Sequence, residues 1–223
     1  MTEATTRRGR PPQTQEQAEE VRARIVLATA EVFTRNGSRG LSVAQIIEQA
    51  GLARPTFYRY FGNATEPLHV LLNTSNDGLV DGIRLALTGT DEPVDLGIRL
   101  IDAYLDWAGG HGAMLRPLFA ELHDPGSPVS AYRERALDDI RALVRARFTE
   151  LGRPVPSPLD LDAALHVCEY IVYRISAGTE PGGEPDPETV AAGRLTMIRV
   201  LLTTLGTRTD LEYAMRLPGI FPV

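Results

Sequence analysis

The 223-residue chain contains no lysine, and all 23 of its basic residues are arginine. A phosphate-binding loop needs a lysine after its glycines, a protein kinase needs a strand lysine, and a pyridoxal enzyme needs a Schiff-base lysine. The absence of lysine therefore excludes these three classes of enzyme.

Cysteine is almost absent as well, since Cys168 is the only one. A single cysteine forms no disulfide within the chain and no Cys-x-x-Cys site, and it is typical of a reducing cytoplasm. His166 lies two positions away, but residues so spaced on a helix point to different faces, which favours Cys168 as a small buried apolar residue. No Gly-x-Ser-x-Gly or His-Glu-x-x-His motif occurs. We therefore expect no catalytic residues, no metal and no cofactor.

No apolar run is long enough to span a membrane, and the N-terminal residues 1–8 lack the apolar region of a signal peptide. We therefore expect a cytoplasmic protein with no membrane partner. The length and the 43% hydrophobic content suit a small domain joined to a larger core.

Residues 42–61 predict two short helices joined by a tight turn. Ser42 can cap the first helix, and Gln45 three positions later completes a capping box. Gly51 tolerates the left-handed backbone that such a turn needs, and Pro55 suits the first turn of the second helix. This pattern is typical of a helix-turn-helix.

The second of these helices has two faces. Phe57 and Phe61, four positions apart, point to the core. The cap of the first helix and the residues on the outer face and flanks of the second are the candidate DNA contacts: Ser42, Arg54, Pro55, Thr56, Tyr58, Arg59 and Tyr60. The alternative is a packed helical hairpin whose exposed residues form an ordinary polar face.

The distribution of charge favours DNA binding. Residues 1–62 hold nine Arg against six Asp plus Glu, a net charge of +3. The whole chain carries −6, so the remaining residues carry −9. Because phosphate contacts dominate DNA affinity, the positive segment is the expected DNA-binding end.

At these residues the chain resembles the TetR family of transcriptional repressors. The resemblance rests on Gly40-Leu41-Ser42, on the turn Ala50-Gly51-Leu52 and on the run from Thr56 to Phe61. It implies an N-terminal three-helix domain with the helix-turn-helix and a C-terminal helical domain that binds a ligand and dimerises. The family usually has a phosphate-contacting lysine where this chain has Ala64.

Breakers and helical periodicity predict an all-α chain in three parts. These are a flexible basic arm over residues 1–15, the DNA-binding domain over 16–62, and an effector-binding and dimerisation domain over 63–223. Within the last part, we expect Gly109-Gly110-His111-Gly112 to interrupt a helix that spans about 94–108.

The arm contains Arg8-Gly9-Arg10-Pro11, which matches the core of AT-hook peptides. Such peptides lie in the narrow minor groove of A·T tracts, so Arg8 and Arg10 are candidate minor-groove contacts. The alternative is a solvated basic tail that attracts DNA without regard to sequence.

The last two long helices carry matching apolar stripes at spacings of 4, 3, 4 and 3. The stripes are Leu161, Leu165, Cys168, Val172 and Ile175, then Ala191, Leu195, Ile198, Leu202 and Leu205. They predict an antiparallel pair that buries its stripes either against a partner subunit or in the core of its own protomer. The resemblance favours a homodimer, because TetR-like proteins dimerise through a four-helix bundle of these helices.

Large apolar and amphipathic residues gather around the predicted helix break. They are the candidate ligand contacts: Tyr104, Trp107, Met114, Leu115, Phe119, His166, Tyr170 and Tyr173. Incomplete packing at a break can leave a cavity for a hydrophobic or amphipathic small molecule. The alternative is that these residues only fill the core.

The sequence thus predicts a DNA-binding transcriptional regulator, a repressor that a small-molecule effector releases from double-stranded operator DNA. Activation is the alternative mode. An enzyme that uses the C-terminal domain and a helical interaction module are the alternative classes. The enzyme is disfavoured because no nucleophile–base pair or metal cluster is found in the sequence.

Overall fold

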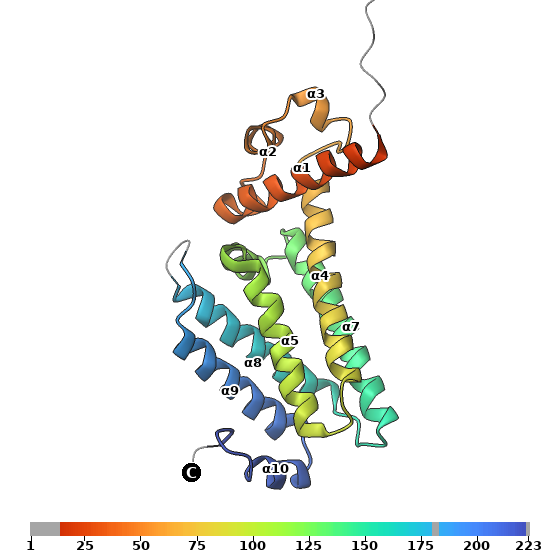
Figure 1. Cartoon of the computed structure of the whole chain (residues 1–223), viewed down its shortest axis with the longest axis vertical. Coiled ribbons are helices and arrows are strands. Elements are labelled where there is room, and N and C mark those ends of the chain that lie inside the picture. The colour runs from red at the N-terminus through yellow and green to blue at the C-terminus, as the bar shows by residue number, and fades with distance from the viewer. Residues whose placement is uncertain (1–13, 180–182, 222–223) are drawn as a thin grey trace, which may run out of the picture.

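The computed structural model describes residues 14–179 and 183–221, and every regular element within these residues is a helix (Figure 1). The elements are α1 (Gln15–Asn36), α2 (Val43–Ala50), α3 (Arg54–Phe57), α4 (Thr65–Thr88), α5 (Pro93–His111), the 3-10 turn η1 (Gly112–Met114), α6 (Leu115–Glu121), α7 (Pro128–Glu150), α8 (Pro158–Ala177), α9 (Pro187–Leu205) and α10 (Arg208–Ala214). The predicted all-α fold class is confirmed.

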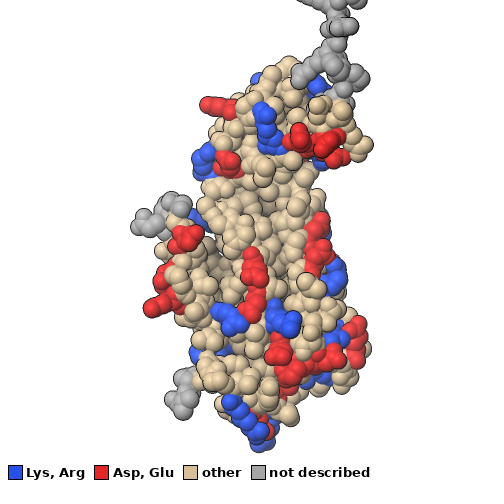
Figure 2. Space-filling view, viewed as in Figure 1, with Lys and Arg blue, Asp and Glu red and all other residues tan. Residues whose placement is uncertain are grey.

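The molecule is elongated, with α1, α2 and α3 forming a head at one end (Figure 1). The long helix α4 leaves the head and runs down the body beside α5 and α7. α8 and α9 pack side by side, and α9 also packs on α5. On the face shown in Figure 2, acidic side chains are spread over the body and interleaved with arginines.

Side chains of the preceding residues begin several helices. Thr14 and Thr207 each form a capping box at α1 and α10. The Ser42 hydroxyl oxygen accepts from the Gln45 backbone N–H at 3.3 Å, as predicted. The same hydroxyl donates to the Gln45 side-chain carbonyl at 2.7 Å, so that this amide does not reach back to the Ser42 backbone. The capping box predicted at Ser42 is therefore only half formed.

Two sets of contacts join the head to the body. Phe33 of α1 is fully buried in the body's core together with Leu68 and Leu72 of α4. After α1, the backbone N–H of Ser38 donates to Oε1 of Glu121 at the end of α6, at 2.8 Å. The head is therefore held by both α4 and α6.

The break predicted at Gly109–Gly112 begins later than predicted. α5 continues through Gly109 and Gly110 to His111, and the chain turns only at Gly112, where φ is +49°. The His111 ring closes the last turn, because Nδ1–H donates to the Trp107 carbonyl at 2.7 Å while Nε2 accepts from the Ser75 hydroxyl at 2.8 Å. Side-chain bonds of this kind do not show in periodicity.

The helix α10 was not predicted from the sequence. It is short, and it is tied to the loop after α7 by an ion pair between Arg153 and Asp210. Within residues 14–179 and 183–221, no helix combines the length and the apolar character needed to cross a bilayer.

Two glycines test how the backbone limits stability. Gly51 has φ +59°, so Gly51→Ala should lower the free energy of unfolding by about 1–2 kcal/mol. Gly78 is an exposed residue inside α4, and a Cβ added there would meet no other atom. Gly78→Ala should therefore raise the free energy of unfolding by about 0.5–1 kcal/mol. Urea denaturation measures both. Equal midpoints for Gly51→Ala and wild type would contradict the left-handed turn.

Candidate nucleic-acid interface and ligand cavity

The helix-turn-helix consists of α2, the turn after it and α3. Gly51 ends α2 in the left-handed conformation predicted for it. Arg24 of α1 donates through Nε to the Ala50 carbonyl at 2.7 Å and through Nη2 to the Gly51 carbonyl at 2.9 Å. These bonds satisfy carbonyls that the end of a helix leaves free, and they fix the turn to α1. Sequence reasoning missed this role, because Arg24 lies 26 positions before Ala50.

The second helix is short, but its turns continue past α3. The backbone N–H groups of Tyr60 and Phe61 both donate to the Phe57 carbonyl, at 2.9 and 3.0 Å. Phe57 and Phe61 are buried in the head's core, as predicted. Among the remaining candidate contacts of this helix, four are exposed and two are half-buried: Arg54, Pro55, Tyr58 and Arg59, then Thr56 and Tyr60.

Two candidate DNA-contacting groups lie against each other on the outer face. The Arg54 guanidinium lies over the Tyr58 ring, 5.6 Å from its centre, and Nη2 donates to the Tyr58 hydroxyl at 3.3 Å. The face thus offers a cation and an aromatic hydroxyl at one place. The contacts of these residues with DNA stay a prediction, as does that of Ser42.

The position of the usual family lysine is occupied by a side chain that cannot reach a phosphate. Ala64 is half-buried and packs on the head's core at the start of α4. Its neighbour Asn63 accepts, through Oδ1, from the backbone N–H of Thr65 at 2.9 Å. The candidate minor-groove residues Arg8 and Arg10 lie outside the described residues.

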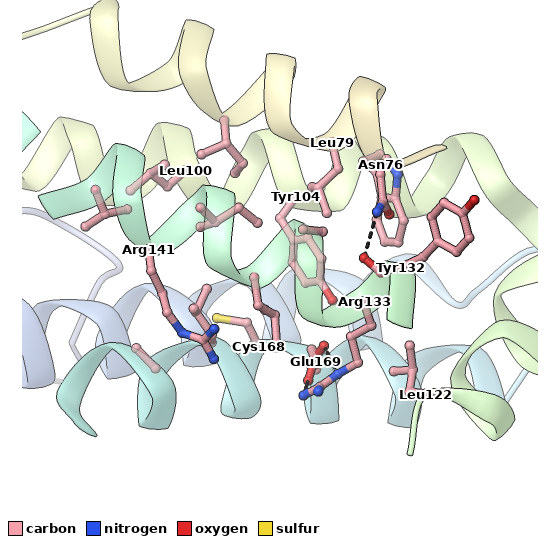
Figure 3. A pocket seen from close by; sticks show the side chains of 18 of the residues that line it. Asn76, Leu79, Leu100, Tyr104, Leu122, Tyr132, Arg133, Arg141, Cys168 and Glu169 are labelled. Atoms are coloured by element: carbon pink, nitrogen blue, oxygen red, sulfur yellow. Dashed lines mark hydrogen bonds and ion pairs between the residues drawn. The ribbon is translucent and has the colours of Figure 1, made fainter. Parts of the chain in front are cut away.

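The body contains a cavity of about 110 Å³ between α4, α5, α6, α7, α8 and α9 (Figure 3). Its wall follows α4 from Leu72 to Ile83 and α7 from Val129 to Val144. These stretches are about 16 and 22 Å long at the rise of an α-helix, so the cavity is long and narrow. Ligand pockets usually hold roughly 300–1,000 Å³, and a ligand would therefore have to widen this one.

Three of the predicted ligand contacts line this cavity: Tyr104, Trp107 and Phe119. Tyr104 and Trp107 stack, with ring centres 5.7 Å apart, and the Trp107 indole N–H donates to the Ser75 carbonyl of α4 at 3.0 Å. Met114 and Leu115 are buried in the adjacent core and do not reach the cavity.

The three candidates on α8 do not line this cavity, and their contact with a ligand stays a prediction. Tyr170 and Tyr173 are exposed, and His166 is exposed where α8 meets α7, with its Nε2 bonded to Nη2 of Arg133 at 2.9 Å. The side that faces the cavity carries Leu161, Leu165 and Cys168 instead, since helical geometry points residues two positions away to another face.

Sequence reasoning missed the charged residues of the cavity wall. Arg133 is buried, and its Nε and Nη2 donate to the two carboxylate oxygens of Glu169 at 2.8 and 2.6 Å. A charged residue on the apolar stripe of α7, beside Tyr132 and one turn before Leu137, was the available signal.

The electrostatics of the wall keep two nearby groups neutral. Burial, then the negative charge of Glu169, raises the pKa of Tyr104 well above its usual range. Burial, again followed by the charge of Glu169, raises the pKa of the Cys168 thiol to about 12. Both groups therefore remain protonated at neutral pH, with the Tyr104 hydroxyl available as a donor.

Residues 25–66, which span most of α1, all of α2 and α3 and the start of α4, match the family model described as "Bacterial regulatory proteins, tetR family". The N-terminal helix-turn-helix part of the chain is therefore similar to the TetR family of regulators.

Curated relatives match less than half of the chain. The transcriptional activator FasR of Mycolicibacterium smegmatis is 28% identical over 89 residues, which are 40% of this chain and 41% of FasR. The transcriptional regulator TtgR of Pseudomonas putida is 33% identical over 84 residues, 38% of this chain and 40% of TtgR. The matched part thus spans about two fifths of these relatives.

Solved structures match over nearly the whole chain. The fatty acid degradation regulator FadR from Bacillus halodurans superposes with a TM-score of 0.65 at 18% identity, covering 90% of this chain and 99% of that one. FadR from Bacillus subtilis in complex with stearoyl-CoA gives 0.62 at 18% identity, covering 83% and 99%. At such identities the similarity concerns the fold alone.

Most of the predicted dimerisation residues lie on the inner side of α8 and α9. Five are buried in the protomer's own core: Leu161, Cys168, Val172, Ile198 and Leu202. Four are half-buried: Leu165, Ile175, Leu195 and Leu205. For the five buried residues the alternative of burial in the protomer's own core holds, because α5, α6 and α7 pack on α8 and α9 within the protomer. Dimerisation itself stays a prediction. Ala191 alone is exposed.

The reactivity of the Cys168 thiol tests whether this side chain is buried in the cavity wall. With a pKa of about 12, it forms roughly a thousandfold less thiolate at pH 8 than an ordinary thiol. We expect iodoacetamide to alkylate Cys168 very slowly in the folded protein and rapidly in urea, as followed by mass spectrometry. Equal rates in both states would contradict the burial of this side chain.

Proposed function

We propose that this protein is a DNA-binding transcriptional regulator whose affinity for its operator depends on a small molecule bound in the cavity of the body. The observation that carries the proposal is the helix-turn-helix, whose exposed outer face combines Arg54, Tyr58 and Arg59 at one end of the molecule. In a two-fold dimer, two such faces can enter successive major grooves about 34–36 Å apart.

We infer that the dimer forms through the outer faces of α8 and α9, since the inner faces are covered within the protomer. Tyr170 and Tyr173 are exposed on α8 there. We further infer that the protein represses transcription. Activation is the alternative, because one curated relative is named an activator.

The packing supports two routes from the cavity to the head. α4 lines the cavity through Leu79 and packs beside Phe33 of the head through Leu72. α6 lines the cavity through Phe119 and binds the chain after α1 through Glu121. A ligand that widens the cavity would shift both helices. Such coupling is typically worth about 1–3 kcal/mol, which changes affinity roughly 5–150-fold.

We propose a long-chain acyl compound as the effector. A narrow apolar cavity that follows α4 and α7 suits a flexible chain better than a compact ring system. The solved structures named for fatty acid regulators, one with bound stearoyl-CoA, support this class. A long-chain acyl compound is one kind of the hydrophobic or amphipathic ligand that the sequence predicts.

A gel shift on DNA upstream of the protein's own gene tests the proposed regulator. We expect a discrete protein–DNA complex that resists non-specific competitor DNA. Long-chain acyl compounds should dissociate this complex. The absence of any complex would favour an enzyme or a helical interaction module instead.

Variants of the outer face test the DNA contacts. Arg54→Ala should weaken operator binding by about 1–3 kcal/mol and relax the preference at one base pair. Tyr58→Phe keeps the ring and removes one hydroxyl, which should cost about 0.5–1.5 kcal/mol. Fluorescence anisotropy at about 150 mM salt measures both. Arg208→Ala, exposed on α10 at the far end, is the control. If both variants bind like wild type, another surface binds the DNA.

Trp107 tests the link between cavity and head. Trp107→Phe removes the hydrogen bond to α4 and part of the ring that stacks on Tyr104. We expect the ligand concentration that releases half of the operator to rise about tenfold, while operator affinity without ligand changes less than about twofold. Tyr213→Phe, an exposed aromatic residue on α10, is the matched control. Loss of operator binding without ligand would show that Trp107 is only structural.

A further inference from the structure

The charged residues of the cavity wall gather on the seam between α7 and α8. Among the described residues that line the cavity, only Arg133, Arg141 and Glu169 carry a charge. The two arginines lie eight positions apart on α7, about 12 Å along its axis. On α4, Asn76 and Ser75 already have partners, since Nδ2 of Asn76 donates to the Tyr132 carbonyl at 2.7 Å and the Ser75 hydroxyl is bonded to His111. A ligand with a polar end would therefore meet charge only at the seam.

Two ion pairs close this seam, where α7 and α8 otherwise touch at few points. Arg133 holds both oxygens of Glu169, and Arg141 donates through Nε to Asp162 at 2.7 Å. Figure 3 shows both arginines reaching from α7 toward α8, with Cys168 between them. Arg141 lines the cavity, and its partner Asp162 is half-exposed to solvent. At this place the Arg141–Asp162 pair is therefore the layer of side chains between the cavity and solvent.

The buried pair is bound from several sides. Arg133 also donates through Nη2 to Nε2 of His166 at 2.9 Å and forms an ion pair with Glu134. Its charge therefore remains compensated in part when Glu169 moves away. Glu169 itself is near the surface, with 15% of its side chain exposed. A turn of this side chain into solvent needs no change in the fold.

A neutral donor faces the pair from the opposite wall. The Tyr104 hydroxyl points toward Arg133 and Glu169 (Figure 3), and no side chain or backbone group of the described residues is hydrogen-bonded to it. The hydroxyl borders the cavity and can donate to a group bound there. A ligand oxygen placed between Tyr104 and Arg133 would accept from this hydroxyl.

We propose that the effector carries an anionic polar end, which binds Arg133 in place of Glu169 and accepts from the Tyr104 hydroxyl, while its chain fills the apolar cavity. This inference rests on the effector cavity proposed above. An anion in an apolar cavity is costly unless it is paired and hydrogen-bonded. The planar guanidinium of Arg133 presents two parallel donors, which match a carboxylate or phosphate. Glu169 occupies this position while the cavity is empty.

A titration with three ligands of equal chain length tests the proposal. Myristate and myristoyl-CoA carry an anionic end, and tetradecan-1-ol carries a neutral one. The emission of Trp107, the only tryptophan and a residue of the cavity wall, reports binding. We expect at least one anion to bind about tenfold or more tightly than the alcohol, as for hydrogen bonds to charged groups. Myristate binding alone would identify a carboxylate, and myristoyl-CoA binding alone would identify carrier phosphates.

Two variants make the test specific to the seam. Glu169→Gln removes the competing carboxylate, so it should tighten anion binding severalfold and leave the alcohol unchanged. Arg133→Gln should abolish the preference for the anion. If Arg133→Gln does not fold, the result for Glu169→Gln decides the test. Arg208→Gln on α10, whose side chain is 92% exposed, is the matched control.

The outcomes separate this inference from the proposed function. Equal affinity for the alcohol and both anions, or no gain from Glu169→Gln, would overturn the anionic end and leave the effector cavity in place. If none of the three ligands binds folded protein, the acyl effector class proposed above is wrong, and this inference fails with it.

Discussion

The burial of α4 along its whole length is the constraint on which the rest of the structure depends. Three hydrophobic clusters hold the described part of the chain together, and α4 alone among its helices contributes to each. Val70 packs on the head's core, Leu72 on the upper core of the body, and Ile83 on the lower core. Any displacement of α4 must therefore be felt in all three. This makes it the natural carrier of a signal between cavity and head.

The cavity lowers the stability that this packing provides. A void of 110 Å³ gives up about 2–3 kcal/mol relative to a filled core, at roughly 24 cal/mol per Å³. That is a large part of the usual stability of a domain. A ligand that fills the void recovers this energy, but it must first separate helices that are already close. The loose α7–α8 seam, held by ion pairs at Arg133 and Arg141, is where separation disrupts the least apolar packing.

The head could be predicted almost residue by residue. The cap at Ser42, the left-handed Gly51 and the buried pair Phe57 and Phe61 are all confirmed. Each depends on interactions between residues a few positions apart, which sequence spacing describes directly. The body could be predicted only as helices. Tyr104 and Trp107 were assigned correctly to the cavity, but Tyr170 was assigned to it although it lies on the outer face of α8.

By itself, the sequence determined the class of the fold, the helix-turn-helix and the enzyme classes that a chain without lysine excludes. Only the tertiary structure decided what each apolar stripe faces. Periodicity shows that Leu161 and Leu202 are buried, but not whether a partner or the protomer's own helices cover them. Likewise, the pairing of Arg133 with Glu169 joins residues 36 positions apart. Local spacing carries no information on such contacts, because they depend on how whole helices pack.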